Sequence, residues 1–173
     1  YTAVFTYWRY EKQTKTVVLP NADHSFDETT HQCICGLIGG SYTNDAGHVH
    51  HWTLEDGMLF IAGTGEMPNF FNGTAPWYTY RSRIIDVVID SGITAIGYSA
   101  FDDCVKLESV DIPNSVTAVG PCAFENCSSL TEITLPDSVT SIGDYVFQDC
   151  ISRQSIVIPE GITQITYHMF RNC

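Results

Sequence analysis

The sequence predicts a β-rich solenoid, a fold in which short repeats stack on one another, and three observations support this fold class. First, residues 82–173 divide without gaps into four blocks of equal length, 82–104, 105–127, 128–150 and 151–173. Second, block positions 3, 6, 8, 12, 15 and 20 are apolar throughout, except at Arg153. Third, every block has phenylalanine at position 20 and cysteine at position 23. Because so short a block cannot bury its apolar face alone, consecutive blocks must share a core.

The pattern within each block predicts two short strands followed by a turn segment. Apolar positions 6 and 8 alternate with polar neighbours, which is typical of a strand. Pro113, Pro136 and Pro159 end this strand, since proline donates no backbone hydrogen bond. A second extended run follows, as in residues 116–119, and a glycine then permits a tight turn. The remaining residues suffice for only one or two helical turns.

Residues 49–81 predict a β-hairpin cap. Two apolar runs flank Asp56-Gly57, a dipeptide typical of hairpin turns. The hairpin is expected to cover the otherwise exposed apolar edge of the first block. Its aromatic residues allow two interpretations, the core of the cap, which we favour, and a stacking platform for sugar rings; they are Trp52, Trp77, Tyr78 and Tyr80.

Residues 1–48 leave two alternatives open. Alternating apolar residues in 1–20 fit either a separate hairpin or the last strands of a preceding β domain. The stretch "NADHSFDETTHQC" (21–33) is polar, so we expect a loop there, and we expect a boundary near residues 20–48. Since the chain begins at Tyr1 and ends inside the repeat pattern, we expect it to be a piece of a longer protein.

The segment "LESVDIPNSVTAVGPCAFENC" (107–127) and its copies resemble the BspA-type leucine-rich repeat. Upstream, "HWTLEDGMLFIAGTGEM" and "APWYTYRSRI" are similar to the segment that often precedes these repeats in bacterial surface proteins. Arg153 and Thr166 depart from the pattern in the fourth block, as does Asp90 in the first.

The resemblance implies a right-handed leucine-rich-repeat solenoid of the α/β solenoid class on secreted or cell-surface proteins of bacteria and some protists. It implies adhesion or macromolecule recognition, with a protein or glycan of a host or neighbouring cell as partner. An extracellular or cell-surface location follows from the same resemblance.

Composition excludes several functional classes. The net charge of −12, from 20 acidic and 8 basic side chains, argues against nucleic acid as a partner. No run of 18 apolar residues is present, so no membrane-spanning helix is expected. No nucleophile, phosphate-loop or metalloprotease motif occurs. We therefore expect neither catalysis nor a cofactor.

One group of residues resembles a metal site weakly. Zinc accepts imidazole and thiolate ligands, but Cys-x-Cys is tighter than the usual ligand separation. A surface loop with free thiols is therefore favoured over zinc. The candidate ligands are His24, His31, Cys33 and Cys35, with His48, His50 and His51 as further candidates.

The cysteine column also leaves alternatives open. Stacked strands lie about 4.8 Å apart, which a disulfide would tolerate. A cysteine that occurs once per turn beside phenylalanine is more simply a small buried residue, so free thiols are favoured. The column consists of Cys104, Cys127, Cys150 and Cys173. Cys122 lies outside it and is the candidate reactive thiol.

Block positions 5 and 7 are predicted to be exposed on the strand face, and this mixed acidic and hydroxyl row is the candidate binding surface. The row consists of Asp86, Val88, Ser109, Asp111, Glu132, Thr134, Ser155 and Val157. An equally weighted alternative is a solvated sheet face with the partner elsewhere. A second functional hypothesis is structural, because the last block shows no cap and its stacking on another chain would give a filament or surface array.

Overall fold

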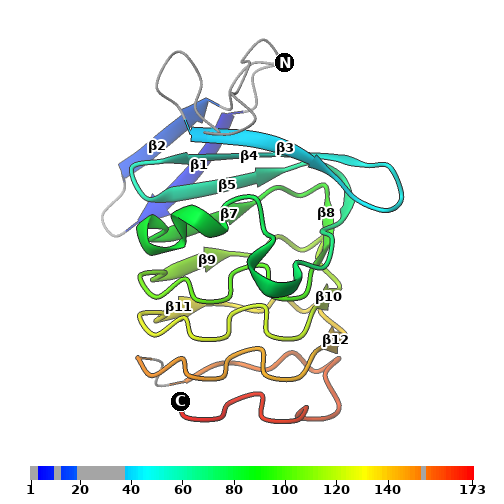
Figure 1. Ribbon diagram of the computed structural model, residues 1–173. Helices are drawn as coiled ribbons and strands as arrows, with labels where there is room; N and C mark the ends of the chain where they lie inside the picture. Colours follow the sequence, from blue (N-terminus) through cyan, green and yellow to red (C-terminus); the bar gives the residue numbers. More distant parts are fainter. Residues whose placement is uncertain (1–3, 10–12, 19–37, 153–154) are drawn as a thin grey trace.

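The computed structural model describes residues 4–9, 13–18, 38–152 and 155–173. Two sheets run along a stack of layers, with the C-terminus in the last layer (Figure 1). The first sheet has the order β11-β9-β7-β5-β4-β3. Its strands are β3 (Ile38–Thr43), β4 (Val49–Glu55), β5 (Met58–Ala62), β7 (Asp86–Ile89), β9 (Ser109–Asp111) and β11 (Glu132–Ile133).

The second sheet is smaller and has the order β12-β10-β8-β6. Its strands are β6 (Gly65–Glu66), β8 (Ile93–Ile96), β10 (Ala118–Val119) and β12 (Ser141–Ile142). β1 (Val4–Arg9) and β2 (Gln13–Val18) form a separate antiparallel pair. Of two 3₁₀ helices, η1 (Phe71–Gly73) precedes the first complete repeat and η2 (Tyr78–Arg83) runs into its first residues.

The sequence period becomes the register of both sheets. Asp86, Ser109 and Glu132 occupy the same block position and pair side by side in parallel strands. The same alignment in the second sheet joins Ala95 to Ala118. Each repeat therefore forms one layer, and its neighbours supply the backbone partners of its strands.

A third ladder of hydrogen bonds joins the turn segments. The amides at block positions 18, 20 and 22 donate to carbonyls of the next repeat; those of Cys122 and Phe124, for example, reach Asp144 and Val146 at 2.9 and 3.0 Å. Residues at positions 18 and 22 have positive φ in every repeat, between 50° and 60°. The predicted helical turns are therefore replaced by tight turns, in which the residues at positions 18 and 22 adopt the left-handed conformation. Position 22 suits Asp and Asn, which tolerate the left-handed region; it holds Asp103, Asn126, Asp149 and Asn172.

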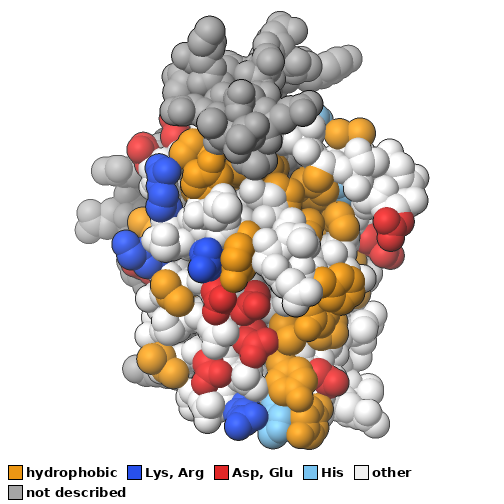
Figure 2. Space-filling view, in the orientation of Figure 1, with side chains coloured by type: hydrophobic (Ala, Val, Ile, Leu, Met, Phe, Trp, Pro, Cys, Tyr) orange, Lys and Arg blue, Asp and Glu red, His pale blue; other side chains and the backbone are white. Residues whose placement is uncertain are grey.

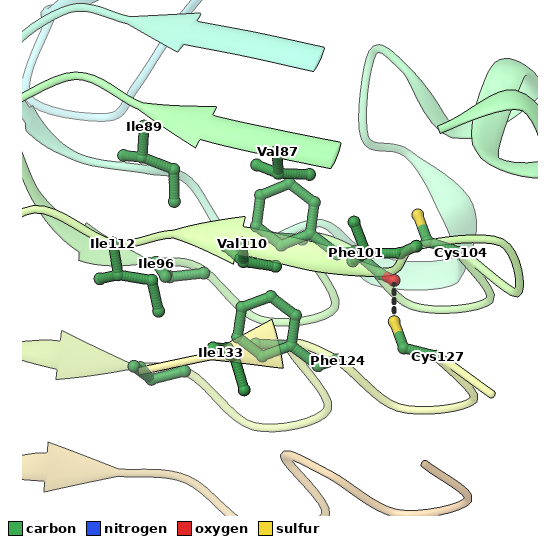
Figure 3. Close-up of a cluster of buried hydrophobic side chains, with 14 of the residues drawn as sticks. Val87, Ile89, Ile96, Phe101, Cys104, Val110, Ile112, Phe124, Cys127 and Ile133 are labelled. Carbon is green, nitrogen blue, oxygen red and sulfur yellow. Dashed lines mark hydrogen bonds between the residues drawn. The ribbon is translucent and has the colours of Figure 1, made fainter. Parts of the chain in front are cut away.

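The core is built from columns of identical residues. The rings of Phe101 and Phe124 stack with centroids 5.4 Å apart and planes inclined by 12°. Phe147 and Phe170 continue the column at separations of 5.7 and 5.8 Å. Figure 3 shows Phe101 and Phe124 beside aliphatic side chains of the first sheet, including Val110. The shared core that the sequence predicts is therefore continuous through the stack.

The repeat glycines serve close approach between layers. A Cβ at Gly120 would lie 2.7 Å from the Tyr98 nitrogen, and one at Gly143 would lie 2.3 Å from the Pro121 nitrogen. These glycines have no positive φ. These glycines therefore allow the backbone of the preceding layer to approach closely, and they do not adopt a positive-φ turn conformation. In the last repeat, Thr166 replaces glycine and its hydroxyl donates to the Gly143 carbonyl at 2.6 Å.

The predicted hairpin forms, and it also begins the stack. β4 and β5 pair antiparallel around Asp56 and Gly57, whose φ values of 50° and 86° fit a type I′ turn. β5 then pairs in parallel with β7, with Leu59 opposite Val87. β6 likewise pairs in parallel with β8. Residues 58–83 therefore form an additional layer that departs from the 23-residue period, which we call the divergent layer. Its residue Leu59 pairs with Val87, an offset of 28 residues.

The large aromatic residues of this region belong to the core. Trp52 and Trp77 are fully buried. Trp77 stacks on Phe101 at 5.9 Å, and its indole N–H donates to the Ala100 carbonyl at 2.8 Å. Tyr78 and Tyr80 are half-buried and pack against the same core. The interpretation of the two tryptophans as a sugar-stacking platform is wrong, because no ring face is open.

Candidate binding surface on the first sheet

The outer face of the first sheet carries the predicted row at block positions 5 and 7. In β9, Val110 points into the core while Ser109 is half-buried and Asp111 is exposed. The next layers present further exposed members of the row, which are Glu132, Thr134, Ser155 and Val157. The prediction of exposure is therefore confirmed for most of the row over residues 109–157.

The predicted exposure of Asp86 and Val88 is wrong. Their side chains are only 4% and 6% exposed. Val88 forms a separate buried cluster with Met58 and Phe60, because β5 lies beside β7 and places Phe60 directly opposite Val88. The sheet face is thus apolar and covered at its first layers, and polar and open at its later ones.

The open part of the face offers hydrogen-bond acceptors. Asp111 and Glu132 present exposed carboxylates on adjacent layers, and Thr134 adds an exposed hydroxyl on the same layer as Glu132. The Ser109 hydroxyl donates to the Asp86 carboxylate at 2.5 Å, so the border of the face is held by a polar contact. Such a row can accept hydrogen bonds and attract positive charge. It contains no arrangement of nucleophile and base.

The candidate zinc ligands His24, His31, Cys33 and Cys35 lie outside the described residues. Of the further histidines, His50 is buried and stacks on Tyr42 at 4.8 Å, whereas His51 is exposed on the opposite face of β4. Within residues 38–152 and 155–173 no group of three or more histidine, cysteine or acidic side chains is placed to hold a metal.

The cysteine column links consecutive layers through thiol hydrogen bonds. The Cys127 thiol donates to the Phe101 carbonyl at 3.2 Å, as Figure 3 shows, and Cys150 donates to Phe124 at the same distance. Both side chains are fully buried, as is Cys104, and burial raises the pKa of the Cys127 thiol. Cys173 differs from the predicted buried column because it is exposed in the last layer, although its thiol still donates to Phe147.

Cys122 is a poor candidate for a reactive thiol. Its side chain is buried, and its sulfur lies 3.8 Å from the Tyr98 hydroxyl. Burial, followed by the Glu125 carboxylate, raises the pKa of Cys122 to about 12. A thiol with this pKa is almost entirely protonated near neutral pH, and the thiolate is the nucleophilic form.

The acidic residues at the repeat ends are more buried than solvated turns would be. Asp102, Asp103 and Glu125 form a half-buried acidic cluster. Burial raises the pKa of Asp102 to about 6, and the neighbouring carboxylates of Asp103 and Glu125 add to the shift. The sequence did hold a signal for this cluster, since Asp102 and Glu125 both occupy block position 21 and the stack therefore places them in adjacent layers.

Comparison with protein families identifies the repeats. The model described as "BspA type Leucine rich repeat region (6 copies)" matches residues 77–173, more than half of the chain. A comparison with curated proteins found no matching relative.

Solved bacterial structures share the fold. A leucine-rich repeat protein of T. pallidum is 23% identical with a TM-score of 0.59, covering 78% of this chain and 64% of its own. A leucine-rich cell surface protein of Faecalibacterium prausnitzii is 25% identical with a TM-score of 0.57, covering 78% of this chain and 40% of its own. A leucine-rich repeat protein of Bacteroides ovatus is 30% identical with a TM-score of 0.51, covering 72% of this chain and 31% of its own. The chain spans less than two thirds of the length of these proteins.

Proposed function

Because the chain belongs to the BspA-type leucine-rich repeat family, we propose that it is a non-catalytic binding module that acts outside the cell or on its surface. Support for this location comes from the Faecalibacterium relative, whose name describes a cell surface protein. None of the similar structures named above carries an enzyme name. In the part of the chain that the structure describes, no helix is long and apolar enough to cross a membrane.

The binding surface in this proposal is the open face of the first sheet together with the equivalent positions of the last layer, from Ser109 to Val157. The observation that carries it is the row of exposed carboxylates and hydroxyls over three adjacent layers, of which Asp111 and Glu132 are the charged members. A right-handed curve of the solenoid, with the hairpin as its cap, would hold this row on one extended surface. The partner is a protein or glycan of a host or neighbouring cell, recognised by its hydrogen-bond donors and positive charge.

Charge reversal on this face tests the proposal. Fluorescently labelled protein is titrated onto epithelial cells and onto bacterial cells, with and without protease or glycosidase treatment of their surfaces. The double variant Asp111→Lys/Glu132→Lys should bind about tenfold more weakly than the wild type. Loss of binding after protease or after glycosidase treatment distinguishes a protein from a glycan partner.

The matched control is Asp137→Lys/Glu160→Lys. Both residues are exposed and follow the prolines that end the first extended run of each repeat, outside the row. This control changes the net charge by the same amount, so it should bind like the wild type. Equal binding by both double variants would remove the sheet face from the proposal.

A second candidate function is end-to-end assembly through the last layer. Ile165 is 62% exposed there, whereas the equivalent Ile142 of the preceding layer is buried, and Ile151 is 66% exposed. Such a head-to-tail contact would produce filaments or a surface array. Light scattering over a hundredfold range of protein concentration should then show growing rods, and a constant monomer mass would reject assembly of this chain.

A further inference from the structure

A strip of aromatic side chains runs along the turns that follow the second sheet. It comprises Phe71, Tyr98, Tyr145, Tyr167 and His168, which we call the aromatic strip. Phe71 and Tyr167 are 56% and 61% exposed, and the other members are half-buried. Figure 2 shows hydrophobic side chains gathered along the lower right of this face, next to a group of acidic ones. An exposed apolar patch of this kind often marks an interaction site.

The stack itself aligns the strip. The ring of Phe71 lies 4.9 Å from that of Tyr98, and Tyr145 lies 5.4 Å from Tyr167. The layer between these pairs contains Pro121, whose carbonyl accepts a hydrogen bond from the Ser99 amide. The strip thus crosses four layer spacings of about 4.8 Å each, or about 19 Å. An extended peptide of about six residues has this length.

The acidic cluster flanks the strip. Asp102 and Asp103 lie four and five residues after Tyr98, and Glu125 lies four residues after Pro121. Cys122, which touches the Tyr98 hydroxyl, also interacts with the Glu125 carboxylate, so the two surfaces meet. The rings of the aromatic strip and the carboxylates of the acidic cluster are therefore close enough to contact one ligand.

The carboxylates of the cluster have neutral partners within the described chain. The Tyr78 hydroxyl and the Asn126 amide donate to Asp103 at 3.2 and 3.0 Å, and the Gln148 amide donates to Glu125 at 2.8 Å. The nearby Arg81 guanidinium instead packs over the Tyr78 ring, 4.1 Å from its centroid. The crowded negative charge is therefore available to a cation supplied by a partner.

We propose that the aromatic strip and the acidic cluster together bind an extended segment of a partner protein that is rich in arginine or lysine. This site is separate from the first-sheet row and lies on different block positions. Guanidinium and ammonium groups pair with carboxylates and also bind the faces of aromatic rings. Charge complementarity favours this occupant over a neutral glycan, which would use the rings without needing the carboxylates.

Peptide binding tests the proposal directly. A fluorescein-labelled octapeptide of alternating arginine and glycine is titrated with the protein at 150 mM salt and followed by fluorescence anisotropy. Asp102→Asn/Glu125→Gln should weaken binding about tenfold. Phe71→Ala/Tyr167→Ala should weaken it about threefold to fivefold, and Tyr167→Phe should retain wild-type affinity.

Two matched variants separate a site from general attraction to an acidic protein. Asp137→Asn/Glu160→Gln removes the same charge elsewhere, and Val49→Ala removes exposed apolar surface elsewhere. Both should bind the peptide like the wild type, and the glutamate–glycine octapeptide should not bind. Circular dichroism confirms that every variant is folded.

Three results would overturn the proposal. One is a wild-type protein that does not bind the arginine peptide. Another is an equal loss of affinity in Asp137→Asn/Glu160→Gln, which would show attraction by net charge alone. The third is tighter binding of a labelled chitin hexasaccharide that Tyr167→Ala abolishes, which would make the strip a glycan surface.

Discussion

The middle repeats, 105–150, and the last repeat, 151–173, share one sequence pattern but differ in burial. Phe124 is fully buried, whereas the equivalent Phe170 is half-buried. Ile142 is buried and the equivalent Ile165 is 62% exposed. The middle layers contain strands of both sheets, while no strand is assigned in the described residues of the last repeat.

This difference shows that block position and neighbouring layers act separately. The position of a residue within its block determines whether its side chain faces the core, so Phe170 still stacks on Phe147. The following layer decides whether that side chain is sealed from water and whether its amide has a partner. Stability should therefore be graded along the stack, as expected when each repeat contacts only its neighbours.

The phenylalanine column should show the largest contrast. Phe124→Ala removes a ring packed between two others and should lower the free energy of unfolding by about 3–5 kcal/mol. Phe170→Ala should cost only about 1–2 kcal/mol, because the ring is partly solvated already. Urea unfolding of the two variants measures both values. Equal losses would show that the last layer is as well packed as the middle ones.

Two glycines at different block positions, Gly143 at position 16 and Gly161 at position 11, should show the next contrast. Gly143→Ala places a methyl group against the Pro121 backbone and should destabilise the fold by about 2–3 kcal/mol. At Gly161 the nearest atom is the Thr140 methyl carbon at 3.1 Å, so Gly161→Ala should change stability by less than about 0.5 kcal/mol. Thermal unfolding compares the pair. A tolerated Gly143→Ala would mean that the layers separate easily.

The cysteine column offers a smaller contrast. Cys127→Ala removes a buried thiol and its bond to Phe101, at a cost of about 1–2 kcal/mol. Cys173→Ala should be nearly neutral because that thiol is exposed. Iodoacetamide under native conditions should modify Cys173 and leave Cys122, Cys127 and Cys150 unmodified until the protein is denatured. Rapid native labelling of Cys122 would contradict its burial.

The acidic cluster should make stability depend on pH. The folded protein raises the pKa of Asp102 from 3.8 to about 6, so its favourable contribution is complete below pH 4 and is lost as pH rises through 6. Asp102→Asn should therefore stabilise the protein by about 1 kcal/mol at pH 7.5, after allowance for solvent screening, and hardly at pH 4. Urea unfolding at both pH values tests this. An equal effect at both would exclude the burial and crowding of the Asp102 charge as its cause.

Much of the fold could be predicted because its information is local and periodic. The apolar columns and the Asp56-Gly57 turn each follow from side-chain patterns. The divergent first layer escaped prediction because its strands are offset by 28 residues and not 23. That layer brings Phe60 opposite Val88, which is why the predicted binding row was too long.

The candidate surfaces show the same limit. Asp111 and Glu132 share a face because strands alternate, which the sequence reveals. The aromatic strip has no such signal, since block position 17 holds Tyr98, Pro121, Asp144 and Tyr167 in successive repeats. Tyr145 and His168 stand at position 18, so only the stacking of the layers brings these side chains together, in the pairs Phe71–Tyr98 and Tyr145–Tyr167.

Hydrogen exchange at single amides tests the central claim, that each layer is ordered by the next. The Phe124 amide donates to the Val146 carbonyl at 3.0 Å, whereas no later layer of the described chain accepts the Phe170 amide. In monomeric protein, Phe124 should exchange at least about a hundredfold more slowly than Phe170. The amides of Cys122 and Asn126 should be protected like that of Phe124. Equal exchange of Phe124 and Phe170 would contradict the account.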